Sequence, residues 1–209
     1  DGTGYLLTKM SDLSNVDRVV KASIVYDSTT STFEASLELG QSDAQPFQLP
    51  HILSVRGMAV LHISDTMAFI HVGTKSSPVT ARVFPDIGGG ITSSSWFMVD
   101  WVYPADPQLN SFTVSVGAYV GWSFTKEFKI CDVTGQIAAG GEVTLTFVPS
   151  LSFYGSMSAS IGAQACGVGV NLSANCAVSC PTIHLQAACA LKISLAVKTI
   201  NLSFAAEQP

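Results

Sequence analysis

The sequence is poor in charge. Only 12% of its 209 residues are Asp, Glu, Lys or Arg, the ten basic residues are scattered singly, and the net charge is −5. Because no basic stripe is available to neutralise phosphates, we expect no nucleic-acid partner. The chain also lacks a run of eighteen apolar residues, so we expect no helical membrane span.

Catalytic motifs are missing as well. The sequence has no Gly-x-Ser-x-Gly elbow, no His-Glu-x-x-His and no Gly-x-x-x-x-Gly-Lys. The glycines at 88–90 precede a Ser-rich segment rather than a helix, so they lack the helix N-terminus that binds phosphate. Asp132-Val133-Thr134-Gly135 differs from an aspartic-protease triplet because a residue separates Asp from Thr. We predict a non-enzymatic protein with no catalytic residue, cofactor or metal.

Apolar residues, by contrast, are abundant. They make up 47% of the chain, with 11 Phe and a mean hydropathy of +0.38, which indicates a folded rather than a disordered chain. After Val143 the composition shifts to Ser, Ala, Gly and Cys. We predict a β-sandwich core region over 1–142 and a long-strand meander over 143–209 that packs on it, with one single domain over 1–209 as the alternative.

Alternation of apolar and polar residues dominates the chain. From Phe112 to Phe124 the apolar side chains keep one parity for thirteen positions, which is typical of a half-buried strand. Further β-runs, bounded by Gly, Pro, Asp and Ser, cover 22–26, 33–39, 52–63, 67–72, 79–84, 96–103 and 143–148. Loops are predicted at 45–50, 76–78, 85–95 and 104–110, and the only helix candidate, 11–21, is short. The fold class is therefore all-β: an antiparallel sandwich or jelly-roll-like barrel with long bent strands and little or no helix.

The length of the C-terminal strands limits how they fit a compact molecule. A straight strand over 151–165 would span about 50 Å, whereas a compact domain of this size is only about 43 Å across. Either the strands bend at glycines, with Gly155, Gly162, Gly167 and Gly169 as corners, or the molecule is elongated. We expect bending, because strands of ordinary length are the commoner solution.

The five cysteines carry a specific prediction. The apolar parity switches at Cys166-Gly167 and again near Pro181, so each place needs a turn. If 181–184 form a four-residue loop, Cys176 lies directly opposite Cys189, close enough for a disulfide. Cys180 lies about 13 Å along the same strand and cannot reach Cys176. The alternative is that these are buried thiols in a reducing compartment.

A disulfide would indicate an extracellular or secreted protein. Two sequons, at Asn171 and Asn201, are glycosylation candidates, and both asparagines fall on the polar parity of their strands. Zinc at Cys176, Cys180, Cys189 and His184 is the competing interpretation of this region, but the shared apolar parity of the cysteines favours burial or a disulfide.

His62 and His71 are the residues closest to a catalytic arrangement. They lie in neighbouring apolar runs that could form a hairpin around 64–67, and on one face they could bind a metal or act with Asp65 as an acid and base. The simpler interpretation is that one points outward and the other is an ordinary strand histidine. His51 and His184 lie beside proline-marked loops without a spaced partner.

The aromatic segment at 96–103 is apolar on both parities. A strand of this kind is buried on both faces, between two sheets or at an oligomer interface, so Trp96, Phe97, Trp101 and Tyr103 are interface or ligand candidates. Aromatic rings beside Asp100 or Asp106 could alternatively stack on sugar rings.

Three hypotheses follow for function. The first is a non-enzymatic secreted β-protein that acts by self-assembly or binding, as a coat, matrix, shell or recognition module, with a homo-oligomer and a carbohydrate or hydrophobic ligand as expected partners. The second is a membrane-active or hydrophobic-ligand-binding β-protein that uses the uncharged alternating strands over 151–197, since strands that cross a bilayer need about 9 to 11 residues. The third is a hydrolase that uses His62 or His71 with a carboxylate.

Overall fold

The computed structural model describes residues 2–4, 20–40, 47–49, 53–83, 89–127, 132–148, 150–166, 168–181, 185–195 and 198–208. These residues form fourteen strands: β1 (Gly2–Gly4), β2 (Val20–Asp27), β3 (Thr32–Leu39), β4 (Phe47–Leu49), β5 (Leu53–Ile63), β6 (Met67–Val72), β7 (Val79–Val83), β8 (Gly89–Val102), β9 (Ser111–Glu127), β10 (Asp132–Val148), β11 (Ser152–Ala165), β12 (Val168–Pro181), β13 (Leu185–Leu195) and β14 (Lys198–Gln208). One turn of 3₁₀ helix, Pro107–Leu109, precedes β9. The part of the chain that the structure describes contains no helix with the length and apolar character needed to cross a membrane.

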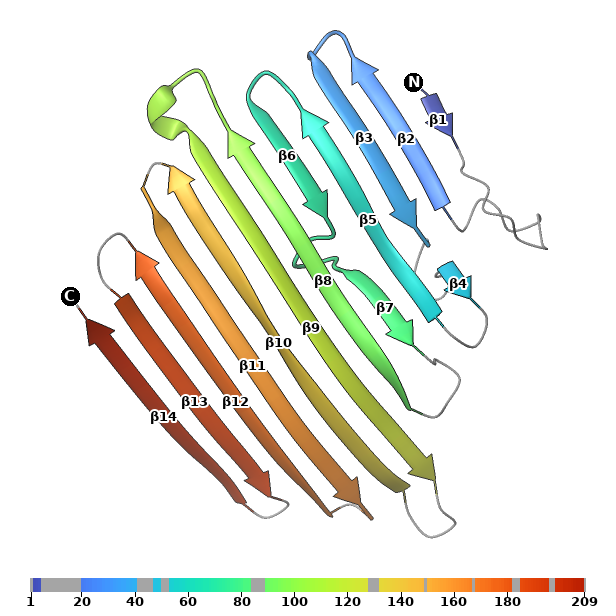
Figure 1. Cartoon of the computed structure of the whole chain (residues 1–209), viewed down its shortest axis with the longest axis vertical. Coiled ribbons are helices and arrows are strands. Elements are labelled where there is room, and N and C mark those ends of the chain that lie inside the picture. The colour runs from blue at the N-terminus through green and yellow to red at the C-terminus, as the bar shows by residue number, and fades with distance from the viewer. Residues whose placement is uncertain are drawn as a thin grey trace.

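All fourteen strands belong to one sheet. Its main order is β1-β2-β3-β5-β6-β8-β9-β10-β11-β12-β13-β14, and the paired strands among the described residues are antiparallel (Figure 1). Most strands pair with their neighbours along the chain, as expected where short turns join antiparallel strands. The prediction of an all-β antiparallel fold with little or no helix is confirmed. Among the described residues, no second sheet packs on the first.

One strand position in the sheet is shared by two short strands. β6 and β7 both lie between β5 and β8, with β6 against the ends of those strands at Ile63 and Val102 and β7 against their other ends. The loop 73–78 separates β6 from β7, and Gly73 enters it with φ +66°, a conformation that favours glycine. The loop therefore interrupts this one strand position, whereas β5 on one side and β8 on the other continue past it.

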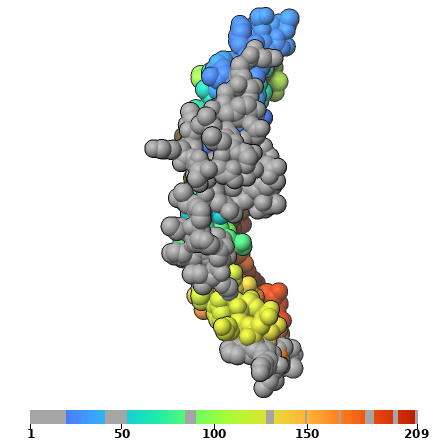
Figure 2. Space-filling view, turned by 90° about the vertical axis from the view of Figure 1, so that its right-hand side faces the viewer, coloured from blue at the N-terminus to red at the C-terminus, as the bar shows by residue number. Residues whose placement is uncertain are grey.

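The long strands do not turn corners. β11 pairs with β10 and β12 without a break in register through Gly155 and Gly162. The expectation of bends at these glycines is wrong, and the elongated alternative is right: the strands curve gently (Figure 1), and seen edge-on the molecule is narrow (Figure 2). The reason is that β9, β10, β11 and β12 have similar lengths, so each backbone finds partners along its whole extent.

One other expectation differs from the structure. The loop predicted over 85–95 is strand from position 89, because β8 begins at Gly89 and pairs with the distal end of β9, Gly89 opposite Phe124. The division of the chain into two regions at position 143 stays a prediction; the position itself lies within β10, which pairs with both β9 and β11. The helix candidate over 11–21 falls mainly outside the described residues, as do His51, Cys131, Gly167 and His184.

The two faces of the sheet differ sharply. Because side chains alternate along a strand and pair across strands, the register assigns each residue to one face. One face carries the even-numbered residues of β2, β6, β9, β12 and β14 and the odd-numbered residues of β3, β5, β7, β8, β10, β11 and β13. We call it the apolar face. The other is the polar face. Alternation that was visible in single strands thus extends across the whole sheet.

The sheet has little buried interior. Among the described residues, Val20 and Trp96 are the buried large apolar side chains, and Glu142 is the buried charged one. The accessible surface is 13,792 Å², whereas a compact protein of 22.0 kDa would have about 9,300 Å². Most of the large apolar side chains left exposed lie on the apolar face.

Candidate functional site

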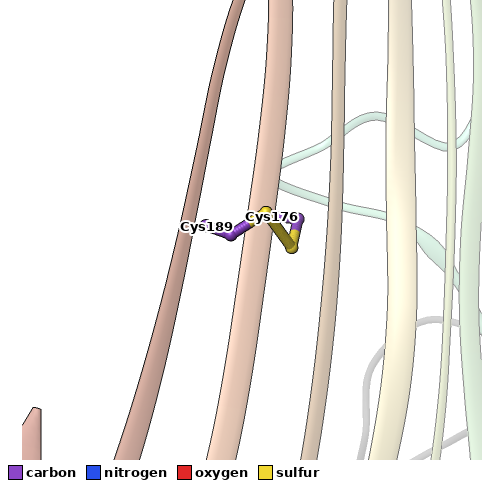
Figure 3. The surroundings of a disulfide bond; sticks show 2 residues. All are labelled: Cys176 and Cys189. Atoms are coloured by element: carbon purple, nitrogen blue, oxygen red, sulfur yellow. A yellow bond between two sulfur atoms is a disulfide. The ribbon is translucent and has the colours of Figure 1, made fainter. Parts of the chain in front are cut away.

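The predicted cross-strand disulfide is present. Cys176 on β12 pairs directly with Cys189 on β13, and the two are joined across the apolar face (Figure 3). The flanking pairs are also the expected ones, with Val178 opposite Ala187 and Ala174 opposite Leu191. Because these cysteines are oxidised, they are not zinc ligands. A disulfide is compatible with an extracellular location.

The remaining described cysteines lie at the strand ends. Cys166 forms the turn between β11 and β12 with φ +53°, at the place where the parity switch predicted one, and it is also disulfide-bonded. Cys180 is half-buried and free. The two sequon asparagines, Asn171 and Asn201, are exposed on the polar face.

The predicted aromatic candidates divide between the two faces. Trp96 is only 4% exposed on the polar face and stacks on Tyr119 with ring centroids 5.7 Å apart. Phe97 and Trp101 lie on the apolar face, where they are 41% and 54% exposed. The Tyr103 hydroxyl donates a 2.6 Å hydrogen bond to the Ser64 carbonyl, closing the end of the sheet. The segment is therefore not enclosed between two sheets, and its apolar-face members remain uncovered.

A row of stacked rings crosses the polar face at β5 and β6. Phe69 lies between His62 and His71, with ring centroids 4.8 Å and 4.3 Å away. The two histidines share a face and the predicted hairpin, but the phenyl ring separates them, so they do not converge on one ion or one reacting atom. Within the described ranges, no group of three or more His, Cys, Asp or Glu lies close enough to hold a metal ion.

Each histidine has a carboxylate neighbour that the sequence analysis missed. His71 Nε2 lies 2.8 Å from Asp100 Oδ1, and His62 Nδ1 lies 3.5 Å from Glu34 Oε2. Asp100 reaches His71 because β8 pairs directly with β6, although β7 separates these two strands in the sequence. No local sequence pattern indicates this long-range pairing. The row is best described as two separate His and carboxylate pairs on a polar surface.

A second polar cluster lies where β6 and β7 are interrupted. Lys75, in the loop 73–78, contacts Glu142 of β10 with Nζ 2.8 Å from the carboxylate, and the Ser156 hydroxyl donates to the same carboxylate at 3.4 Å. The hydrogen bond to Glu142 raises the pKa of Lys75 above its usual range. Glu142 is 8% exposed, so its charge is compensated by one lysine and one hydroxyl. This cluster fastens the loop to the middle of the sheet.

The polar face also has a hollow lined by residues of β9, β10, β11, β12 and β13. It is lined by hydroxyl and amide side chains, among them Ser123, Gln136, Gln164 and Asn171, around Gly162 and Gly169. Such a lining offers neutral hydrogen-bond donors and acceptors but no nucleophile with a base.

The apolar face is the most extensive feature of the molecule. Of the residues that the register places on this face within the described ranges, the charged ones are Lys126 at the end of β9 and Lys198 at the start of β14. Between the strand ends the described part of the face is formed by aliphatic and aromatic groups together with Ala, Gly, a few Ser and the Cys176–Cys189 disulfide. Monomeric proteins rarely leave more than a few hundred Å² of contiguous apolar surface uncovered, so this face is the candidate interaction surface.

Comparison with protein-family models, curated proteins and solved structures yields no match to the chain.

Proposed function

We propose that the protein acts without catalysis, as a secreted β-protein that assembles or binds by burying the apolar face of its sheet. The observation that carries the proposal is the contrast between the two faces. The ion pair of Lys75 with Glu142 and the two His and carboxylate pairs lie on the polar face, whereas the described residues of the apolar face carry charge only at strand ends.

The surface area supports the same conclusion. The chain exposes about 4,500 Å² more than a compact protein of its mass. Exposed apolar area costs free energy of about 25 cal/mol per Å², so contact with another apolar surface is strongly favoured. The low charge of the chain leaves little electrostatic repulsion to oppose association.

The secreted location is part of the proposal. The disulfide between Cys176 and Cys189 supports it, and so does the exposure of Asn171 and Asn201 on the polar face, where glycans would leave the apolar face free. An intact-mass measurement of the protein from a eukaryotic secretory host tests this part. A glycan on either asparagine agrees with it, and retention of a fully reduced protein inside the cell contradicts it.

Two methionines of the same chain test which face is covered. Met157 on the apolar face is 70% exposed in the single chain, and Met58 on the polar face is 48% exposed. If the apolar face is buried in the native protein, dilute peroxide oxidises Met157 at least fivefold more slowly than Met58. In the unfolded protein the two rates should converge, which is the control. Oxidation of Met157 at or above the rate of Met58 in the native protein would overturn the proposal.

A second candidate function is membrane activity or binding of a hydrophobic ligand. The observation that favours it is the length of β11 and β12, 14 residues each, which exceeds the 9 to 11 residues that a strand needs to cross a bilayer. Liposome leakage tests it, together with the emission of Trp101, whose side chain is exposed on the apolar face. Release of dye with a blue-shifted emission supports the candidate. Absence of release across lipid compositions and pH values removes it.

A further inference from the structure

Large and small side chains are arranged in separate rows on the apolar face. One row of large side chains runs straight across the last six long strands, with each member paired to the next: Trp122, Ile137, Ile161, Leu172, Ile193 and Ile200. We call this row the ridge. Neighbouring strands of a sheet are about 4.8 Å apart, so the ridge, which crosses six strands, is about 24 Å long.

A row of small side chains runs beside the ridge. Ala139, Ala159 and Ala174 lie on β10, β11 and β12 and pair with one another. Each is two residues from a ridge member, so this row, which we call the trough, lies about 7 Å from the ridge along the strands. The trough is three strands wide, because the same row continues into Val120 on β9 and Leu191 on β13, and beyond it Gly141 on β10 pairs with the exposed Met157 on β11. Five ridge members are between 38% and 50% exposed, namely Trp122, Ile137, Ile161, Leu172 and Ile200, and Ile193 is half-buried.

We infer that a second copy of this chain packs on the apolar face, with the central ridge members Ile137, Ile161 and Leu172 of each copy seated in the trough of the other. This inference rests on the proposed function and specifies its partner. A two-fold axis that lies in the interface, between the ridge and the trough and parallel to both, carries these three side chains onto the partner's trough. Such an isologous contact needs only one surface that complements itself, and the adjacent parallel rows form such a surface.

The chemistry of the face agrees with a second copy as the partner. No described charge lies on the face between the strand ends, so self-association desolvates no ion pair and opposes no like charges. The area also fits: obligate homodimer interfaces bury about 2,000 to 5,000 Å² or more, and this chain exposes an excess of that order. A fluid lipid surface would require the hydrophobicity but not the matched ridge and trough.

The test uses two size changes on β11 that should cancel. In the inferred dimer, Ile161 of one copy faces Ala159 of the other. Ile161→Ala removes part of the ridge and Ala159→Leu fills the trough, so each alone should weaken the dimer at least tenfold by sedimentation equilibrium. The double variant again places a large side chain opposite a small one, and its dimerisation constant should return to within about threefold of the original. Asn175→Leu adds a similar bulk on the polar face of β12 and should leave the dimer unchanged.

Several outcomes would overturn the inference. They are a monomer at micromolar concentration without detergent, a dimer that neither single variant weakens, and a double variant no better than the worse single one. Circular dichroism and unfolding temperature confirm that each variant is folded before its mass is interpreted. The oxidation of Met157 separates the two proposals. A monomer that retains lipid and protects Met157 ends the dimer but leaves the proposed function standing, whereas a monomer that oxidises Met157 freely ends both.

Discussion

Lys75 Nζ lies 2.8 Å from the carboxylate of Glu142, and this contact joins the loop between β6 and β7 to the centre of β10. The two residues are sixty-seven positions apart in the sequence. In strand order they lie on opposite sides of Trp96 and Tyr119, and Trp96 is the buried large apolar side chain among the described residues of the polar face. The contact thus holds the loop 73–78 against the polar face of the sheet, beside Trp96.

The first prediction concerns the pH dependence of this contact. Since Glu142 raises the pKa of Lys75 in the folded protein, the contribution to stability is complete below the pKa of an unfolded lysine, about 10.4, and is lost as pH rises through the higher folded value. The lysine is 69% exposed, so the contribution should be below about 1 kcal/mol. Urea unfolding between pH 9 and 12 should show this loss in the original protein and a flatter profile in Lys75→Met. Identical profiles would mean that the contact adds nothing.

The second prediction compares two glycines on the polar face of β9. A Cβ atom at Gly117 would lie 2.1 Å from the Trp96 ring, whereas at Gly121 its nearest neighbour would be 3.8 Å away. Gly117→Ala should therefore destabilise the protein by about 1 to 3 kcal/mol through overpacking. Gly121→Ala, the matched control, should be neutral or stabilising, because alanine reduces the freedom of the unfolded chain. Equal unfolding temperatures for the two variants would show that Trp96 is not packed against β9.

The third prediction concerns the disulfide. Cys176 and Cys189 are 13 residues apart, and closing a loop of this size stabilises a protein by about 3 kcal/mol in the chain-entropy description. The double variant Cys176→Ser, Cys189→Ser should lower the free energy of unfolding by about that amount. Cys180→Ser, which changes a free cysteine of the same strand, serves as the control and should have a much smaller effect. Non-reducing peptide mapping should recover Cys176 and Cys189 in one linked peptide, and alkylation of both without reductant would contradict the bond.

The disulfide also illustrates what could be predicted from the sequence. Its register follows from alternation together with a four-residue loop at 181–184, because a slip of one residue would turn every apolar side chain of β12 or β13 to the wrong face. The strand positions of β3, β5, β6 and β9 follow from the same alternation to within a few residues. Local patterning was sufficient for these strands, but it missed residues 89–95 of β8 and 132–142 of β10.

Other features could not be predicted in this way. The pair of His71 and Asp100 depends on β6 and β7 sharing one position between β5 and β8, which is a long-range arrangement. Alternation also identifies which side chains share a face, but it does not specify what covers that face. A sandwich and an open sheet therefore have the same sequence pattern, and the ridge and trough emerge only when the five registers that join β9 to β14 are combined.

The fourth prediction concerns the end of the sheet beside β6. The Tyr103 hydroxyl donates to the Ser64 carbonyl at 2.6 Å, and the Tyr103 backbone N–H donates to the Thr66 carbonyl. Tyr103→Phe removes only the hydroxyl and should destabilise the protein by about 1 kcal/mol, the usual net contribution of such a bond. Tyr26→Phe removes a hydroxyl from a side chain that is 62% exposed and should be neutral. A comparable loss in both variants would indicate a general effect of tyrosine replacement rather than the Ser64 contact.

The fifth prediction tests the hydrolase hypothesis against the geometry of the polar face. Because Phe69 separates His62 from His71, no single substrate atom can contact both rings, and each histidine serves only its own carboxylate neighbour. The double variant His62→Ala, His71→Ala should therefore retain the oligomeric mass and the protection of Met157, with only the local stability of β5 and β6 reduced. Hydrogen exchange should show faster opening there, while β10–β13 stay unchanged. Hydrolysis of ester or peptide substrates by the original protein, abolished in this variant, would show that the histidines are catalytic and that the apolar face is not the main functional surface.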